Sequence, residues 1–294
     1  MDEQTVRRAT AAALSIASRL GLPATDATVL HNSNRLALRL TPCDTFARVA
    51  ETGDMRCAAF EVELAQRLAA TGAPVASLEA RAPSEVHLGG GFAVTLWTFY
   101  DIEGEPRATG GLFSGERASD PVASEYASAL IKMHAAMHRI EMITPKWTDR
   151  VADALALVGS PDRTPELPDG DRKFLVGSLR ALRHRIREHR APEQILHGEP
   201  HQGNVLRTKQ GLLFVDLETC CRGPVEFDLA YVPDDVAALY PGANAQLLRE
   251  CRALMLAMVA AWRWDRDDQF PDGAKYRAPL ISELREACER LLLV

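Results

Sequence analysis

Apolar residues recur along the chain at two different spacings, and the change from one to the other divides it near residue 100. Close to the amino terminus, helical spacing predicts a helix over residues 5–20, which a glycine and a proline end. Three short runs with alternating or β-branched apolar residues follow. They predict antiparallel strands, separated by polar turns, over residues 28–30, 36–40 and 45–50.

Helical spacing returns over residues 55–70, and this helix is expected to pack on the sheet. Further strands are expected at residues 75–78, 85–88 and 92–99, with the three glycines at 89–91 as a hairpin turn between the last two. The first part of the chain is therefore predicted to be an α+β lobe, which consists of a small antiparallel sheet with one packed helix.

Beyond a connection rich in glycine and proline at residues 101–121, the pattern becomes mostly helical. Helices are expected over residues 122–140, 146–158, 170–189, 243–262 and 279–293. One island, residues 193–228, interrupts them with glycines, polar residues and short apolar runs. We therefore expect two lobes, residues 1–100 and residues 101–294.

Composition is typical of a folded protein, because hydrophobic residues make up 47% of the chain and charged residues 25%. The formal net charge of −6 argues against binding to nucleic acid, which needs a basic surface to neutralise phosphates. Neutral or cationic small ligands fit this charge better.

The amino terminus mixes charged residues with alanines and has neither the apolar run of a signal peptide nor the length of a membrane helix. We therefore expect a cytoplasmic protein with no membrane partner. The six cysteines have no metal-site spacing, and we expect them to be reduced and structural, including the adjacent pair Cys220 and Cys221.

The island at residues 193–228 has the residues that phosphoryl transfer requires. Glu199 and Asn204 lie five positions apart in a loop between apolar runs, and a strand predicted over 212–217 carries Asp216 and leads to Glu218. Such chemistry needs a carboxylate at the acceptor hydroxyl and hard oxygen ligands that hold Mg²⁺ on the phosphates.

The same island resembles the HGDxHxxN loop, and the D-x-D/E strand after it, of the aminoglycoside phosphotransferase and choline kinase families. The resemblance covers about 35 contiguous residues and includes Gly223, Pro224 and the Asp228-Leu229-Ala230 run. The positions that match the two motifs are His197, Gly198, His201, Asn204, Asp216 and Glu218. It implies a bilobal protein-kinase-like fold, in which residues 1–100 bind the nucleotide and residues 101–294 bind the acceptor.

The resemblance implies a Mg²⁺-dependent phosphotransferase that uses ATP or GTP. The acceptor would be a hydroxyl of a small molecule such as an aminoglycoside-like antibiotic, an amino sugar or an amino alcohol, and the protein would be a monomer or a homodimer. The implied catalytic residue is Glu199, with His201 as the alternative base. The metal ligands would be Asn204, Asp216 and Glu218, and the residues that support the loop would be His197 and Asp228.

One position departs from the motif, because Glu199 stands where the family has Asp. The longer carboxylate can still accept the proton of the acceptor hydroxyl if the loop or the substrate shifts to suit it. The alternative is a catalytically weak pseudokinase that binds a nucleotide or metabolite without turning it over.

In the first lobe, the resemblance calls for a cation on the third strand and a carboxylate on the following helix. Arg48 is the candidate cation, since arginine can bind phosphate through two parallel hydrogen bonds. Glu61 shares the apolar face of the helix, whereas Glu63 lies about 200° further round, so we expect a buried Arg48–Glu61 ion pair and a solvated Glu63. The remaining candidates for nucleotide contact are Asn32, Ser33 and Asn34 in a loop, and Trp97 and Phe99 at the lobe connection.

Aromatic and acidic residues also gather after the helix predicted over 243–262. Such groups can hold a cationic amine through cation–π contacts and ion pairs, although they equally fit a helix end with solvated charges. These candidates for the acceptor pocket are Trp262, Trp264, Asp265 and Asp268.

Overall fold

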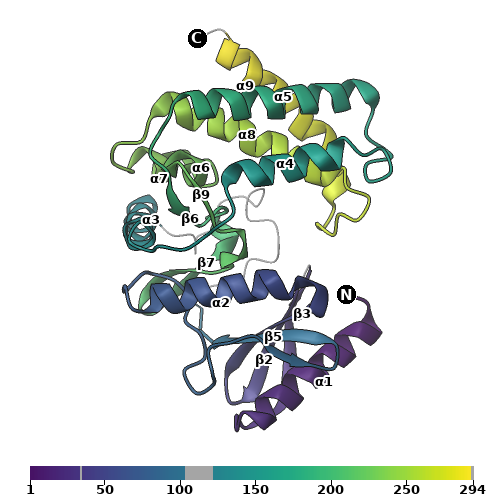
Figure 1. Cartoon of the computed structure of the whole chain (residues 1–294), viewed down its shortest axis with the longest axis vertical. Helices are drawn as coiled ribbons and strands as arrows, with labels where there is room; N and C mark the ends of the chain where they lie inside the picture. The colour runs from purple at the N-terminus through teal and green to yellow at the C-terminus, as the bar shows by residue number, and fades with distance from the viewer. Residues whose placement is uncertain (34, 103–121, 293–294) are drawn as a thin grey trace. The chain divides into compact units, whose positions relative to one another are not determined.

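The computed structural model describes residues 1–33, 35–102 and 122–292 (Figure 1). Asn34, one of the candidates for nucleotide contact, lies outside the described residues. Most of the connection predicted at 101–121 lies outside them as well.

Contacts divide the described residues into two compact units. The first contains residues 1–102 together with 204–218, and the second contains residues 122–203 and 219–292. The segment 204–218 therefore packs with the amino-terminal residues, although it follows them by about a hundred positions in the sequence. The boundary of two lobes at residue 100 stays a prediction.

The first unit has one five-stranded sheet in the order β1-β2-β3-β5-β4, and each strand is antiparallel to its neighbours. The strands are β1 (Ala24–Asn32), β2 (Leu36–Pro42), β3 (Thr45–Glu51), β4 (His87–Gly89) and β5 (Phe92–Thr98). The helical elements are α1 (Glu3–Arg19), η1 (Thr52–Asp54) and α2 (Met55–Ala69). This arrangement confirms the predicted small antiparallel sheet and the helix that follows its third strand.

Alternation along the strands gives the sheet two different faces. Leu38 and Val49 are fully buried and belong to a core that includes Ile16 of α1. Arg48, next to Val49 on β3, points to the opposite face, because successive side chains of a strand alternate. There α2 supplies Glu61, which is 1% exposed. One face of the sheet thus packs against α1 in an apolar core, and the other face carries the ion pair between Arg48 and Glu61 of α2.

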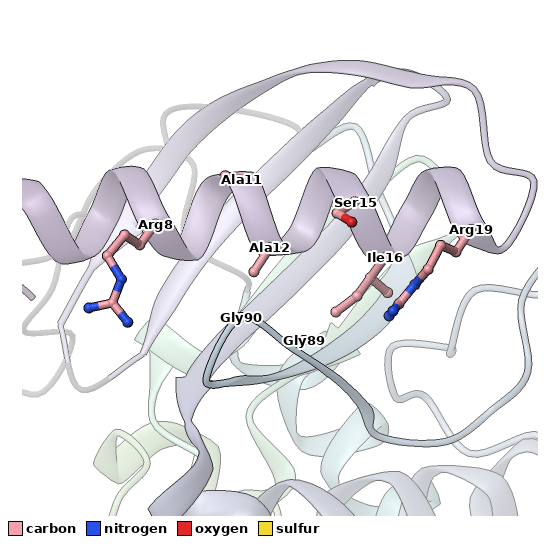
Figure 2. A pocket seen from close by; sticks show the side chains of 8 residues that line it. All are labelled: Arg8, Ala11, Ala12, Ser15, Ile16, Arg19, Gly89 and Gly90. Carbon is pink, nitrogen blue, oxygen red and sulfur yellow. The ribbon is translucent and has the colours of Figure 1, made fainter.

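The glycine turn between β4 and β5 lies against α1. Gly90 and Gly91 have φ angles of 61° and 85°, in the left-handed region that favours glycine. A Cβ on Gly90 would lie 3.3 Å from the Cβ of Ala12, and Figure 2 shows Ala12 and Ile16 on the helix beside this turn. The predicted hairpin turn is confirmed, and close packing against a helix explains its composition.

Residues 75–78 do not form the predicted strand. They make only isolated bridges, from Val75 to Phe214 and from Leu78 to Trp97. The backbone N–H of Ala76 donates to the carbonyl of Phe214 at 2.9 Å. The prediction was wrong because this extended segment touches Phe214 at one end and Trp97 at the other instead of pairing along a whole strand.

Residues 204–218 contain a hairpin of β7 (Val205–Thr208) and β8 (Gly211–Phe214). The strand predicted over 212–217 ends early, because Asp216 has a φ angle of 68°, which no regular strand has. Glu218 then falls in the short turn η3 (Leu217–Thr219), not on a strand.

The second unit is mostly helical, and all five long helices expected from the periodicity are present. Its helices are α3 (Ala123–Met137), α4 (Trp147–Val158), α5 (Asp169–Glu188), α6 (Val225–Leu229), α7 (Asp234–Ala238), α8 (Ala245–Arg263) and α9 (Arg277–Leu292). It also has the strands β6 (Gln194–Leu196) and β9 (Cys221–Gly223), which pair antiparallel, and the turns η2 (Gln202–Asn204) and η4 (Gly273–Tyr276).

Helix α8 is the centre of the second unit. Its residues are buried on most sides, and α4, α5 and α9 pack around it (Figure 1). Trp147 of α4 and Phe227 of α6 extend this core toward β6 and β9. Apolar helices are thus explained by packing, and no described helix is both long and apolar enough to span a bilayer.

The six cysteines are thiols, as expected. Cys220 and Cys221 are both buried, and burial raises the pKa of Cys221 to about 12. A thiol held in its neutral form has little reactivity, which fits a packing role.

Candidate active site

Arg48 is the centre of a cluster of charged side chains in the first unit. Its guanidinium forms an ion pair with Glu61, donates to Asp216 Oδ1 at 2.8 Å and lies 3.4 Å from Glu218 Oε2. The expected Arg48–Glu61 pair is therefore present. Glu63 is half exposed and pairs with Arg67 on its own helix, as the position of its face predicted.

Arg35, at the end of the turn that precedes β2, completes this cluster. Its Nε forms an ion pair with Glu218, and its side chain is largely buried. Arg35 was not predicted from the sequence, because neither a motif nor the strand periodicity marks it. Its only signal was its place next to the polar loop between the first two strands.

Three carboxylates, those of Glu61, Asp216 and Glu218, share the guanidinium groups of Arg48 and Arg35. When all three are ionised, one negative charge is in excess. Burial raises the pKa of Glu61 to about 7, against the opposing charge of Arg48, and burial and then Asp216 raise the pKa of Glu218. For Arg48, burial alone would lower the pKa, but Glu61, Asp216 and Glu218 raise it. A further cation would neutralise the excess negative charge of this cluster.

The backbone around Asp216 brings together the residues that were expected to hold the metal. The N–H of Val215 donates to the carbonyl of Asn204 at 3.0 Å, so Asn204 lies across the hairpin from the residue before Asp216. The N–H of Leu217 donates to Glu61 Oε1 at 3.2 Å. Helix α2 thus supports the turn that carries Asp216 and Glu218.

Asn204, Asp216 and Glu218 offer only hard oxygen donors, the kind that Mg²⁺ prefers. Among the described residues, no group of three or more His, Cys, Asp or Glu side chains has the geometry of a metal site. Asn204, Asp216 and Glu218 supply only two carboxylates and one amide. Such a small set of protein ligands suits Mg²⁺, which usually keeps several waters and binds substrate phosphates. The donor set therefore fits a Mg²⁺ ion bound together with a nucleotide.

Loss of the Arg48 charge is expected to destabilise the protein. Arg48→Met would leave Glu61 buried with its partner removed, and breaking a buried ion pair in this way costs about 3–5 kcal/mol. Urea unfolding would measure the change. The matched control is Arg67→Met on α2, whose half-exposed pair with Glu63 is worth about 0–1 kcal/mol. Equal effects of the two substitutions would contradict a buried Arg48–Glu61 pair.

In the second unit, the loop after β6 is fixed by Asp228. This carboxylate is fully buried and accepts hydrogen bonds from the backbone N–H groups of His197 and Gly198, both at 2.8 Å. It also lies 2.9 Å from His134 Nε2. The arrangement satisfies a buried charge and sets the direction of the loop at Glu199. We keep support of the loop as the proposed role of Asp228.

Gly198 cannot be replaced in this loop without a rearrangement. Its φ angle is 90°, and a Cβ there would lie 2.1 Å from the carbonyl oxygen of Thr219. The hydroxyl of Thr219 in turn donates to the carbonyl of His197 at 3.1 Å. Both the left-handed backbone and the close approach of a second backbone require glycine.

Glu199 is held by Arg150 of α4. One guanidinium nitrogen of Arg150 donates to the carbonyl of Gly198 at 2.9 Å, and the other forms an ion pair with the Glu199 carboxylate. The guanidinium also stacks on Trp262, 5.4 Å from the ring centre. Burial alone would lower the pKa of Arg150, but Glu199 together with Tyr231 and Cys221 raises it. Sequence reasoning missed Arg150, because nothing in its own helix distinguishes it.

The two histidines of the loop contact their own backbone. His201 Nδ1 accepts from the N–H of Gly203 at 3.1 Å, and His197 Nδ1 lies 3.4 Å from the N–H of Glu199. These contacts shape the loop around Glu199. A base role for His201 stays the alternative prediction.

The residues expected to form a phosphate loop are arranged differently. Asn32 is the last residue of β1, and its side-chain amide hydrogen-bonds Met1 through both its oxygen and its nitrogen, at 2.9 and 2.8 Å. The predicted loop is therefore shorter, because β1 extends further than expected. Ser33 lies in the turn, where its N–H donates to the carbonyl of Arg35 at 3.2 Å.

Trp97 and Phe99 lie at the end of the sheet. Trp97 is buried on β5, and its indole N–H donates to Thr95 Oγ1 at 2.9 Å. Phe99 follows the strand, with the guanidinium of Arg39 4.3 Å from its ring centre. Contact of these two residues with a nucleotide base stays a prediction.

Each of the four residues predicted to line an acceptor pocket contacts an arginine of the chain. These pairs are Trp262 with Arg150, Trp264 with Arg277, Asp265 with Arg163 and Asp268 with Arg263. The rings and carboxylates that were expected to hold a cationic amine are therefore engaged by internal cations. The pocket itself stays a prediction.

Comparison with known proteins gives a family and a fold. The model of a family described as the phosphotransferase enzyme family matches residues 24–280. No curated protein sequence matches the chain.

Solved structures with the same fold include an amicoumacin kinase in complex with AMP-PNP, Ca²⁺ and Ami, at a TM-score of 0.70 and 11% identity, covering 97% of this chain and 96% of that one. A choline/ethanolamine kinase family protein from Mesorhizobium loti has a TM-score of 0.66 and 16% identity, covering 97% and 95%. An aminoglycoside phosphotransferase from Streptomyces rimosus with ADP and streptomycin has a TM-score of 0.57 and 16% identity, covering 98% and 99%. The fold is thus that of the protein-kinase-like small-molecule kinases.

Proposed function

Because the chain belongs to the phosphotransferase enzyme family, we propose that it is a Mg²⁺-dependent kinase that moves the γ-phosphate of ATP or GTP to a hydroxyl of a small molecule. The observation that carries this proposal is the cluster in which Arg48, held by Glu61, contacts both Asp216 and Glu218. In this cluster, the cation that would bind the nucleotide phosphates contacts the carboxylates that would bind the metal ion.

In the first unit, we assign Arg48 to the nucleotide phosphates. Glu61 holds the Arg48 guanidinium in one orientation through their ion pair. Because the N–H donors of Arg48 are already oriented, less conformational entropy is lost when they bind phosphate. Asn204, Asp216 and Glu218 would hold Mg²⁺, which when bound would neutralise the charge of the phosphates and that of the carboxylates. Trp97 and Phe99 are assigned to the base, and Ser33 to the phosphates.

In the second unit, we assign the acceptor hydroxyl to Glu199. In the proposed reaction, the hydroxyl oxygen forms a bond to the γ-phosphorus and the bond from that phosphorus to the bridging oxygen breaks. The hydroxyl proton passes to the carboxylate. Arg150 positions this carboxylate, because it holds Glu199 and the carbonyl of Gly198 with the same guanidinium. The ion pair compensates for the extra methylene that Glu has relative to Asp.

For the acceptor, aminoglycoside-like antibiotics, amino sugars and amino alcohols are the classes that the sequence suggests. The complexes with Ami and with streptomycin among the structural neighbours support a small-molecule acceptor in general. A cytoplasmic location and a monomeric or homodimeric state stay predictions.

A second candidate function is a pseudokinase that binds a nucleotide or metabolite. The observation that favours it is the ion pair between Glu199 and the largely buried Arg150, because a carboxylate already engaged by a guanidinium is less available to an acceptor hydroxyl. In this alternative, Arg48, Asp216 and Glu218 would still bind a nucleotide.

The two functions are separated by following ATP consumption with and without Mg²⁺ over a panel of hydroxyl-bearing amines, sugars and acids. A kinase is expected to consume ATP only with Mg²⁺ and one class of acceptor, and Glu199→Ala should lose this turnover. A Mg²⁺-dependent increase in Tm with ATP, without turnover for any acceptor, would instead favour the pseudokinase.

A further inference from the structure

Arg35 is the second guanidinium in the charged cluster around Arg48, and its donors are only partly used. Its side chain is 11% exposed, and its Nε forms an ion pair with Glu218. A guanidinium has five N–H donors in a planar fork. The four on Nη1 and Nη2 of Arg35 have no acceptor among the residues that the structure describes. Neither Nη atom is fully buried, so these donors face solvent.

The pairing of β2 with β3 places Arg35 on the same face of the sheet as Arg48. In this register, Ala37 is directly opposite Arg48. Opposite residues of an antiparallel pair point to one face and successive residues alternate, so Arg35, two positions before Ala37, shares the face of Arg48. The contacts agree, because Glu218 Oε2 pairs with Arg35 Nε and lies 3.4 Å from Arg48 Nη2. Two guanidinium groups from neighbouring strands thus meet at one carboxylate oxygen.

The turn that leads to Arg35 offers few backbone donors. Glycines allow the backbone of a phosphate loop to approach its ligand closely, but residues 31–34 include none. The N–H of Ser33 is used inside the turn, where it donates to the carbonyl of Arg35 at 3.2 Å. An anion bound beside this turn therefore depends on side-chain donors, and the charged ones at its end belong to Arg35.

Of the two guanidinium groups, Arg35 has more donors left for an anion. Arg48 is engaged by three carboxylates, whereas Arg35 is engaged by one. Arginine binds phosphate oxygens through charge-assisted hydrogen bonds, often two in parallel. The pair Nη1 and Nη2 of Arg35 has the form that such binding uses.

We propose that Arg35 is a second phosphate-binding residue, whose Nη donors bind the nucleotide phosphates beside Arg48 while its Nε holds Glu218. This inference rests on the proposed function and deepens it. Arg35 then takes the place of the backbone donors that the glycine-free turn does not supply. The same guanidinium connects the phosphates to Glu218, which we assign to Mg²⁺.

Titration calorimetry of the full chain with ATP and with adenosine, in excess Mg²⁺, tests the proposal. Arg35→Gln is expected to weaken ATP binding by about 10- to 100-fold, the effect of losing hydrogen bonds to a charged group, and to leave adenosine binding unchanged. The control is Arg67→Gln, whose half-exposed side chain pairs with Glu63 on α2, and it should bind both ligands as the wild type does. Wild-type affinity of Arg35→Gln for ATP would overturn the proposal.

A double-mutant cycle separates phosphate binding from mere support of a metal ligand. If Arg35 acts only by holding Glu218, then Arg35→Gln has no further effect on ATP affinity once Glu218→Gln has removed that charge. A phosphate ligand instead loses about 10- to 100-fold in this background as well. Glu218→Gln also removes a negative charge that repels ATP, so the comparison can be made in EDTA as well as in Mg²⁺. No further loss in the Glu218→Gln background would contradict the proposal.

Arg35→Lys keeps the positive charge and replaces Arg35→Gln if the latter does not fold. A single ammonium group cannot hold Glu218 and phosphate with separate donors of a planar fork, so ATP binding should still fall by about tenfold. Wild-type affinity for ATP in Arg35→Lys would show that the fork is not used, and the proposal would fall.

The failure of this inference can be distinguished from the failure of the proposed function. If the wild type binds ATP and phosphorylates an acceptor, and Arg35→Gln binds ATP equally well, the kinase stands and the role of Arg35 falls. If ATP binding depends on Arg35 but no acceptor is phosphorylated, the role of Arg35 stands and the kinase falls.

Discussion

Asp216→Asn is expected to remove most of the Mg²⁺-dependent nucleotide affinity and most of the turnover. Glu61, Asp216 and Glu218 already hold an excess of negative charge over Arg48 and Arg35, and a nucleotide triphosphate brings more. Without a bound cation these charges would repel one another, so binding should depend on the metal and on the carboxylate that can reach it.

The loss should be at least the roughly 10- to 100-fold that removal of a group supporting a metal ligand costs. Isothermal titration of ATP with and without Mg²⁺ would measure it. The substitution should leave the backbone in place, because Asn tolerates the left-handed conformation that Asp216 adopts.

Asp44→Asn is the matched control. Asp44 also has a positive φ angle, 50°, and also pairs with an arginine, Arg39, but it lies in the exposed turn between β2 and β3. Its substitution should leave Mg²⁺-dependent affinity unchanged. If Asp216→Asn bound Mg²⁺ and ATP as well as Asp44→Asn, Asp216 would not be a metal ligand.

Glu199→Gln is expected to behave differently, with nucleotide binding close to that of the wild type and turnover reduced by about 10²–10⁴-fold. That range is usual for the loss of a general base. The amide keeps the size of the side chain and an oxygen that can accept from Arg150, but it cannot take the proton of the acceptor hydroxyl. Steady-state kinetics with a titration of ATP binding would separate the two effects.

The control for this substitution is Glu166→Gln, which changes another Glu–Arg ion pair of the second unit, that with Arg277. Its turnover should be near that of the wild type, and a Tm measurement on both variants would account for any change in stability. If Glu199→Gln turned over at the wild-type rate, Glu199 would not be the catalytic carboxylate, and His201 would be the next residue to substitute.

The departure from the family motif at Glu199 has a structural counterpart in Arg150. The same guanidinium binds the Gly198 carbonyl and the Glu199 carboxylate, so the longer side chain is held beside its own loop. Trp262, which the sequence suggested as part of an acceptor pocket, stacks on this guanidinium. An aromatic residue expected to contact a ligand thus acts on the carboxylate through Arg150.

The sequence alone determined what depends on local spacing. Apolar periodicity predicted the antiparallel strands, the helix after the third strand and the five long helices, because a helix or strand repeats its burial at a fixed interval. The same geometry chose Glu61 over Glu63 as the partner of Arg48, since two positions turn a helix by about 200°. The contiguous motif from His197 to Asn204 identified the loop. Its Gly198 has a left-handed conformation that only glycine adopts easily.

The tertiary structure decided what depends on pairs far apart in the chain. Arg35 meets Glu218 across 183 positions and Arg150 meets Glu199 across 49, and no periodicity relates such residues. Residues 75–78 connect to Phe214 rather than forming a strand, and the segment 204–218 belongs to the first unit. From the sequence, the aromatic and acidic residues near the end of α8 were candidates for binding a cationic ligand. In the folded chain, each of these residues contacts an arginine. The sequence shows which residues can carry a charge, whereas the charges that surround each of them depend on how distant segments pack together.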